Sequence, residues 1–350
     1  MNRTFYNRTV LRSEPVRGRG KRWVRIIPVL IIIAGLGVSL FSLFRKRNVI
    51  FHIQEMITHK KFDKAETLAA DFHEEQPENV HVLQLMGLTY FMQGMKGDHW
   101  QVIKLDRDKG YSVDRLKQQG EEGWKLYKKA VESLKKAILL DKEGIVSSRD
   151  YMIIGFSYSR WGDSHFGRAL KYLNLAYKKN MKDKHLSDSD LPAFSLESLY
   201  RQRGYLLYKI GKYRRAARDF QKANAIDRKV LNYLYIAHCG REAGDLKAAM
   251  ENYRRVVDYS REPVIQSSSL NMLGGIYIKK RRLQEAERVF RRSISIHSNS
   301  ATAYFGLSQV AEARGDRAAA GRYWDLTLKT DPHYGPAILK MRNSRRKWKR

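Results

Sequence analysis

The residues of this chain that are able to do metal or acid–base chemistry are scattered rather than grouped. His73 precedes two glutamates, but the second histidine of a helix-borne zinc motif does not follow. None of the ten histidines has another histidine four residues away, so no helix offers a paired ligand. The single cysteine, Cys239, excludes an internal disulfide and a cysteine-built zinc site, and its place in an apolar run predicts a buried small residue.

Known loop motifs for calcium, phosphate or nucleophilic catalysis are incomplete. The segment from Asp106 to Gly110 is similar to the start of a calcium loop, but the glycine comes one residue early. Lys117 stands where that loop needs a glutamate, so a solvated turn is the better interpretation. The chain has neither a glycine-rich phosphate loop nor a nucleophile elbow. We therefore expect no catalytic residue, no cofactor and no metal, and a protein that is not an enzyme.

Positive charge is extreme and concentrates at the two ends. The chain has 67 Lys and Arg against 36 Asp and Glu, a formal net charge of +31. Residues 1–22 are rich in arginine without apolar periodicity, which predicts a disordered basic tail. The last residues also carry Lys and Arg without acids. Basic ends of this kind favour contact with anionic lipid, and nucleic acid is the less favoured partner.

A hydrophobic stretch follows the basic tail. Residues 26–44 are uncharged and lie between Arg25 and Arg45, a length that matches the hydrocarbon core of a bilayer. No small-residue cleavage site ends the stretch, so an uncleaved single-pass anchor over 23–45 is favoured over a signal peptide. More Lys and Arg precede the stretch than follow it. This bias predicts a cytoplasmic N-terminus and a body outside the cytoplasm, in the periplasm of a bacterium.

The elements beyond the anchor follow a repeating helical pattern, shown best by 197–230. Tyr200, Gly204 and Leu207 form one stripe of an amphipathic helix. After a break at 211–213, a second stripe begins with Ala216 and Phe220. The unit resembles the tetratricopeptide repeat, a helix–turn–helix of 34 residues with small and aromatic residues at these offsets. One position departs from the pattern, because Arg203 stands where it has an apolar residue.

Similar marks recur along most of the chain. They include Phe62 and Ala65; Leu83, Gly87 and Tyr90; Gly155 and Tyr158; Tyr233 and Ala249; Leu273, Gly274 and Phe290; and Tyr304, Leu307 and Trp324. The resemblance covers 46–334, with about seven repeats, an insertion near 95–125 and a linker near 181–195. Residues 335–350 then provide a capping helix and a basic tail. The implied fold is all-α, a right-handed superhelical solenoid preceded by one transmembrane helix.

In the tetratricopeptide family, the first helix of each hairpin lines a concave groove that holds peptides or partner helices. Carried over by position, the groove candidates are Arg149, Arg160, Arg201, Tyr205, Tyr235, His238, Arg241 and Asn271. Arginines beside aromatic residues suit acidic or carboxylate-bearing segments. The family's carboxylate clamp of paired Lys and Asn is incomplete here, so that ligand is not predicted. The arginines are equally consistent with ordinary solvated faces of a basic protein.

Three functions remain open. The first is a membrane-anchored interaction scaffold that assembles an envelope complex for secretion, motility or wall assembly. The second is a receptor that faces the cytoplasm and binds acidic peptide segments, which the opposite topology would select. The third is a basic protein that binds nucleic acid or anionic lipid through its ends. We favour the first because the repeats fill nearly all the ordered chain and the charge bias places them outside the cytoplasm.

Overall fold

The computed structural model describes residues 45, 47–96, 104–106, 110–112, 121–183 and 194–340, and the chain divides into two compact units, Met1–Lys61 and Phe62–Arg350. In the first unit, residues 47–58 are helical. The predicted hydrophobic stretch 26–44 lies outside the described residues, as do the predicted basic tails at 1–22 and 341–350. Across the described ranges, no helix combines the length and the apolar character that crossing a bilayer requires.

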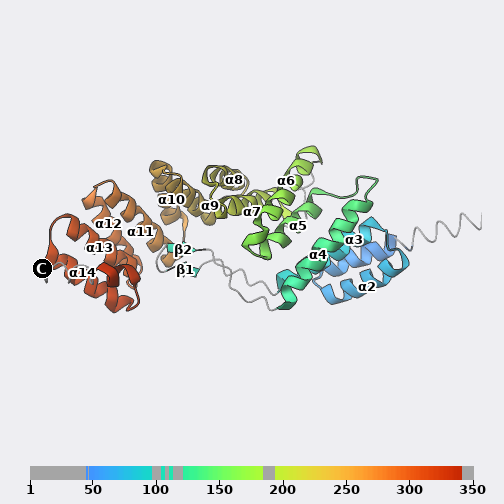
Figure 1. Ribbon diagram of the computed structural model, residues 1–350, viewed down its shortest axis with the longest axis horizontal. Helices are drawn as coiled ribbons and strands as arrows, with labels where there is room; N and C mark the ends of the chain where they lie inside the picture. The colour runs from blue at the N-terminus through green and yellow to red at the C-terminus, as the bar shows by residue number, and fades with distance from the viewer. Residues whose placement is uncertain are drawn as a thin grey trace, which may run out of the picture. The chain divides into compact units, whose positions relative to one another are not determined.

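The second unit is a series of helical hairpins (Figure 1). Its helices are α2 (Phe62–Glu75), α3 (Val80–Lys96), α4 (Glu121–Leu140), α5 (Ser148–Arg160), α6 (Phe166–Asp183), α7 (Leu196–Lys209), α8 (Tyr213–Ile226), α9 (Val230–Glu242), α10 (Leu246–Tyr259), α11 (Pro263–Lys279), α12 (Leu283–Ile296), α13 (Ala301–Ala313) and α14 (Arg317–Thr330). A 3-10 turn, η1 (Asp163–His165), precedes α6. Hairpin partners are α3–α4, α5–α6, α7–α8, α9–α10, α11–α12 and α13–α14, and each hairpin contacts the next. These pairs confirm the predicted helical repeats.

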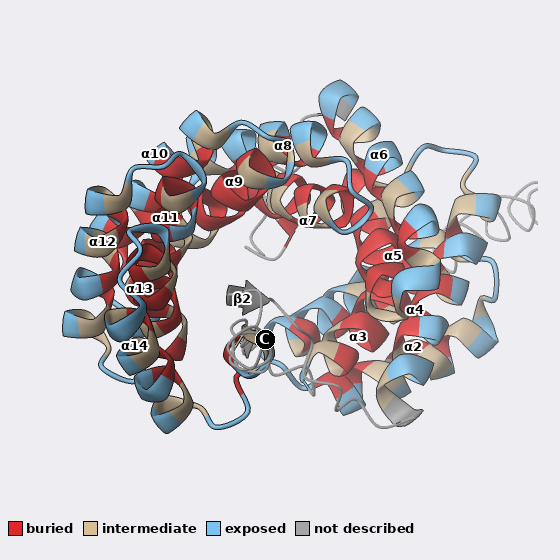
Figure 2. Cartoon of the chain, turned by 60° about the vertical axis from the view of Figure 1, so that its left-hand side comes forward, coloured by how far each residue is buried: buried red, intermediate tan, exposed pale blue. Residues whose placement is uncertain are grey.

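The two helices of a hairpin differ in burial. In α9 every residue from Asn232 to Gly240 is buried, whereas α8 buries only Ala216, Asp219, Phe220 and Ala223. Figure 2 shows the same contrast along the series, with exposed residues on α8, α10 and α12 and buried residues filling α9 and α13. The first helices are therefore packed between neighbours, and the second helices are amphipathic and face solvent on one side.

Glycine allows the tight turn between the two helices of most hairpins. Gly211, Gly244 and Gly315 follow α7, α9 and α13 with φ of 76°, 81° and 84°, a region that side chains disfavour. In the α11–α12 turn the corresponding residue is Arg281, with φ of 59°. Side-chain caps then begin two of the second helices: Asp245 and Asp316 accept hydrogen bonds from the N–H groups of Ala248 and Ala319. Local sequence thus fixes where each hairpin turns.

Small residues let the helices of a hairpin approach closely. A Cβ placed on Gly204 would lie 3.2 Å from three ring atoms of Phe220, so α7 and α8 meet closely through that ring and a side chain at 204 would require the ring to shift. Ala216 is fully buried in the same contact. In α11 and α13, Gly274 and Gly306 both face Phe290, which therefore packs within its own hairpin and against the next one. Such contacts make each repeat depend on its neighbours.

The insertion predicted near 95–125 and the linker predicted near 181–195 fall largely outside the described residues and stay predictions. Between α3 and α4, the antiparallel strands β1 (Lys104–Asp106) and β2 (Gly110–Ser112) pair with Leu105 opposite Tyr111. The sequence analysis did not predict these strands. Between α6 and α7, residues 184–193 lie outside the description, and Phe194 is fully buried just before α7. At the C-terminal end, residues 335–340 are helical, with Ala337 buried against the α13–α14 hairpin.

Candidate partner-binding groove

The eight predicted groove residues lie on the first helices of consecutive hairpins. Arg149 and Arg160 belong to α5, Arg201 and Tyr205 to α7, Tyr235, His238 and Arg241 to α9, and Asn271 to α11. Neighbouring first helices contact one another from α5 to α9 and from α11 to α13, and Arg241 of α9 reaches Met272 of α11, so these residues are distributed along one continuous layer. We call this layer of α5, α7, α9, α11 and α13 the first-helix face. Whether the eight residues bind a partner stays a prediction.

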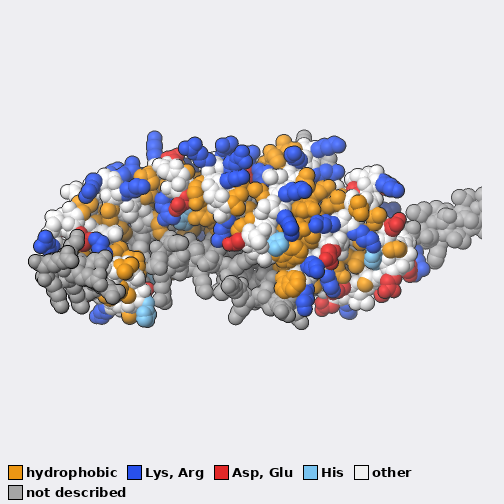
Figure 3. Space-filling model, in the orientation of Figure 1, with side chains coloured by type: hydrophobic (Ala, Val, Ile, Leu, Met, Phe, Trp, Pro, Cys, Tyr) orange, Lys and Arg blue, Asp and Glu red, His pale blue; other side chains and the backbone are white. Residues whose placement is uncertain are grey.

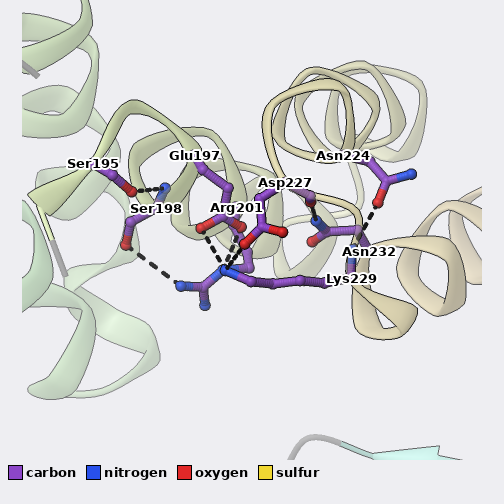
Figure 4. Close-up of polar contacts among 8 residues, drawn as sticks. All are labelled: Ser195, Glu197, Ser198, Arg201, Asn224, Asp227, Lys229 and Asn232. Atoms are coloured by element: carbon purple, nitrogen blue, oxygen red, sulfur yellow. Dashed lines mark hydrogen bonds and ion pairs between the residues drawn. The ribbon is translucent and has the colours of Figure 1, made fainter. Parts of the chain in front are cut away.

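Arg201 is already paired within the chain (Figure 4). Its Nε donates to Oε1 of the buried Glu197 at 3.0 Å, and Lys229 Nζ donates to the other Glu197 oxygen at 3.0 Å. Lys229 also contacts Asp227 at 2.9 Å. Partial burial lowers the pKa of Lys229, the two carboxylates raise it, and the net shift is upward. The network joins α7 to the start of α9, so Arg201 has a structural role and its charge is compensated.

Arg203, which departs from the repeat pattern, forms a second and more buried ion pair. Its Nε and Nη2 donate to the two oxygens of Asp219 at 2.6 and 2.8 Å, linking α7 to α8. The guanidinium also lies 4.5 Å from the ring centroid of Tyr177 in α6. Burial and the neighbouring Tyr177 raise the pKa of Tyr200 to about 12. The sequence signal for this pair was Asp219 itself, an acid beside the core residue Phe220.

Arg241 and His238 occupy the next first helix. Arg241 donates from Nε and Nη2 to the carboxylate of Glu242, at 3.1 and 2.7 Å, and from Nη1 to Met272 Sδ at 2.9 Å. His238 is buried, with its Nδ1 2.8 Å from the hydroxyl of Tyr253, and burial lowers its pKa to about 3. His238 is therefore a neutral core histidine at physiological pH. Cys239, beside it, is buried as predicted.

The two tyrosines of the predicted groove belong to an aromatic cluster. Tyr235 stacks on Phe220 with ring centroids 4.7 Å apart, and Tyr205 packs edge-on against Tyr235 at 6.0 Å. Burial raises the pKa of Tyr235 well above its ordinary value. Tyr205 is half-buried, and Lys209 Nζ lies 5.9 Å from its ring centroid. Tyr205 is thus the tyrosine of the pair that presents surface to a partner.

The arginines of α5 are half-buried. The Arg160 guanidinium lies 5.4 Å from the Phe91 ring centroid and 5.5 Å from that of Tyr127, and its Nη1 donates to the carbonyl of Phe156 at 3.2 Å. Arg149 has a buried Nε with no hydrogen-bond partner in the described chain. Arg201 and Arg241 are already compensated by internal carboxylates. Arg149 is therefore the predicted groove arginine best able to bind an incoming carboxylate.

Asn271 lies at a polar hollow of about 320 Å³ between α11, the start of α13 and the turn after α14. Its Nδ2 donates to Ser300 Oγ at 3.0 Å, while its Oδ1 is buried without a partner. The lining also includes Ser268, Thr302 and His333. Among the described lining residues, Asp331 is acidic and Lys and Arg are absent, so the hollow offers hydrogen bonds and disfavours an incoming carboxylate.

Unsatisfied polar groups gather on the first helices. Among described residues, the buried side-chain atoms without a hydrogen-bond partner include Arg149 Nε, Asn232 Oδ1, Tyr235 Oη, His238 Nε2 and Asn271 Oδ1. Among all such atoms in the described residues, His73 Nδ1 and Trp324 Nε1 lie on second helices, and the others lie on the first helices α3, α5, α9 and α11. No cluster of three or more possible metal ligands occurs in the described ranges. The unsatisfied atoms are enclosed in the packed first helices, so they belong to the core rather than to the accessible surface.

Comparison with known proteins agrees with this architecture. Residues 267–299 match the model of the tetratricopeptide repeat family. The C-terminal part of a TPR repeat-containing protein from Cytophaga hutchinsonii is similar over 83% of this chain and 98% of its own, with 10% identity and a TM-score of 0.56. The fold is a tetratricopeptide-repeat solenoid. The apo form of RapI is also similar, over 82% of this chain and 76% of its own, with 12% identity and a TM-score of 0.52. A comparison with curated proteins gave no match.

Proposed function

We propose that this chain is a membrane-anchored scaffold that binds a protein partner on its first-helix face and so organises an envelope complex. The observation that carries the proposal is the continuous layer of first helices, which presents half-buried side chains such as Arg149 and Tyr205 along one face. Tetratricopeptide solenoids commonly use this face for peptides.

The ion pairs on this face determine where an acidic partner segment could bind. Glu197 and Glu242 compensate Arg201 and Arg241, so an incoming carboxylate would have to compete with an existing one. Arg149 has no such internal carboxylate partner. We therefore propose that an acidic segment of the partner engages the α5 end, while hydrogen bonds dominate at the polar hollow beside Asn271. The two ends of the face would then fix the direction of the bound segment.

Anchoring is proposed from the sequence. Residues 26–44 have the length of a bilayer span, and the excess of Lys and Arg before them favours repeats outside the cytoplasm. An anchor next to the first repeat would hold the partner near the membrane. The opposite orientation would instead make the chain a receptor that faces the cytoplasm, and labelling from one side of the membrane separates the two.

The binding face is tested by capture of partners from an envelope extract on the detergent-solubilised full chain. Thr302→Arg places a long side chain into the polar hollow, and we expect it to abolish capture of the specific partner. Gln284→Arg adds the same charge on the exposed side of α12 and serves as the matched control. If both variants capture the partner as the unsubstituted chain does, the hollow is not part of the binding face. Equal loss in both would indicate binding through overall charge.

A further inference from the structure

The outer sides of α6 and α8 form a basic surface without compensating acids. On α6, the exposed Arg168, Lys171, Lys178 and Lys182 make no hydrogen bond or ion pair within the described chain. On α8 the same holds for Arg214, Arg215 and Arg218. Figure 3 shows Lys and Arg side chains gathered over α6, α8 and α10. The charge of these second helices is therefore available to a partner, unlike that of Arg201 or Arg241.

Acidic residues do not offset this surface. The acid of α8 is Asp219, which is buried in its pair with Arg203. The acid of α6 is Asp183, its last residue. In contrast, the second helix α12 carries Glu285 and Glu287 in ion pairs with Arg282, Arg291 and Arg314. Apart from Asp183 at the end of α6 and Asp227 just after α8, these two neighbouring second helices present cations, which favours binding to an anionic surface.

Large apolar side chains are exposed in the last turns of successive second helices, where Lys178 and Lys182 are the neighbouring cations on α6. Leu139 of α4 is 83% exposed, Met181 of α6 59%, Ile226 of α8 53% and Tyr259 of α10 60%. Hairpins in series repeat the same helix direction, so these last turns lie along the same edge of the repeat series. A repeated row of exposed apolar tips is unusual for a surface that meets only water.

We propose that this edge and the basic sides of α6 and α8 rest on an anionic lipid bilayer. Lys and Arg would lie at the phosphate level, and the apolar tips would enter the boundary between headgroups and acyl chains. Nucleic acid fits less well, because it would offer phosphates to the cations but nothing apolar to Leu139, Met181 or Ile226. The proposal concerns a different surface from the first-helix face, so both contacts can exist at once.

The test compares lysine acetylation of the full chain in two kinds of lipid nanodisc, one of phosphatidylcholine and one that also contains phosphatidylglycerol. We expect acetylation of Lys171, Lys178 and Lys182 to slow on the order of threefold or more in the anionic disc, and the protection to disappear in high salt. Lys329, on α14, is exposed and should react equally in both. If the chain associated with anionic discs and not with discs of phosphatidylcholine, the proposed lipid-binding surface would be supported and the predicted membrane anchor would be contradicted.

A pair of charge-reversal variants makes the test specific. Arg214→Glu with Arg218→Glu should remove the protection, whereas Arg288→Glu with Arg292→Glu, an exposed pair with the same spacing on α12, should leave it unchanged. Equal protection in both discs, equal loss in both double variants, or protection of the same lysines by duplex DNA but not by anionic lipid would overturn the proposal. Partner capture in detergent is unaffected by the lipid result, so the groove and this surface fail independently.

Discussion

Replacing Arg203 by methionine tests the buried ion pair that the repeat pattern does not contain. The substitution keeps an unbranched apolar stem but leaves Asp219 buried without its two charge-assisted hydrogen bonds, at 2.6 and 2.8 Å. Breaking a buried pair by removing one partner costs on the order of 3–5 kcal/mol. Loss of the contact with the Tyr177 ring adds up to about 2 kcal/mol. We expect the melting temperature to fall on the order of 10 °C.

The double variant Arg203→Met with Asp219→Leu should recover most of that loss. Replacing a buried pair by apolar residues of similar volume is often neutral or stabilising, by about 1–4 kcal/mol. Melting followed by circular dichroism at 222 nm would measure all four members of the cycle. Arg255→Leu is the matched control, because Arg255 pairs with Glu251 in an exposed position where a pair contributes about 0.2–1 kcal/mol. A double variant as unstable as the sum of the single ones would refute the reasoning.

Three further outcomes follow from the packing. Ala216→Leu should overpack the fully buried α7–α8 contact and lower the free energy of unfolding by about 1–3 kcal/mol, as measured by melting. Ala225→Leu, on the exposed side of α8, is the control and should change the melting temperature little. An unchanged melting temperature for Ala216→Leu would contradict the repeat register. The pKa of His238 lies near 3 in the folded chain and at about 6.5 when unfolded, so unfolding takes up a proton below pH 6.5. Stability should then fall by up to about 1.4 kcal/mol per pH unit from pH 6 toward 4, and His238→Gln should flatten that slope in urea unfolding; an unchanged slope would show that other groups cause it. Lys212→Cys tests the topology, because it adds an exposed thiol while burial of the native Cys239 raises the pKa of its thiol to about 12. An impermeant maleimide should label the new thiol from outside the cytoplasmic membrane of intact cells. Labelling only from the cytoplasmic side would reverse the predicted orientation.

The sequence was sufficient for the helical repeats because their signals are local. Small residues recur at fixed offsets, as Gly204 and Ala216 do, and turn glycines such as Gly211 supply the left-handed backbone that ends a first helix. These requirements act within one hairpin, so they are visible in a window of about 34 residues. The first helices that carry the predicted groove residues could be assigned for the same reason.

Which charges are compensated across helices was decided only by the tertiary structure. Arg203 and Asp219 are far apart in sequence relative to a helical turn, and α7 and α8 must pack before they meet. Arg201 and Lys229 share Glu197 only because α9 follows α8 back against α7. Glu197 lies four residues before Arg201, so that pair is local to α7, whereas Arg203 meets Asp219 and Lys229 meets Glu197 only after separate helices pack. The physical reason is that an ion pair between two helices depends on distances of a few ångströms between them, and periodicity within one helix does not specify those distances.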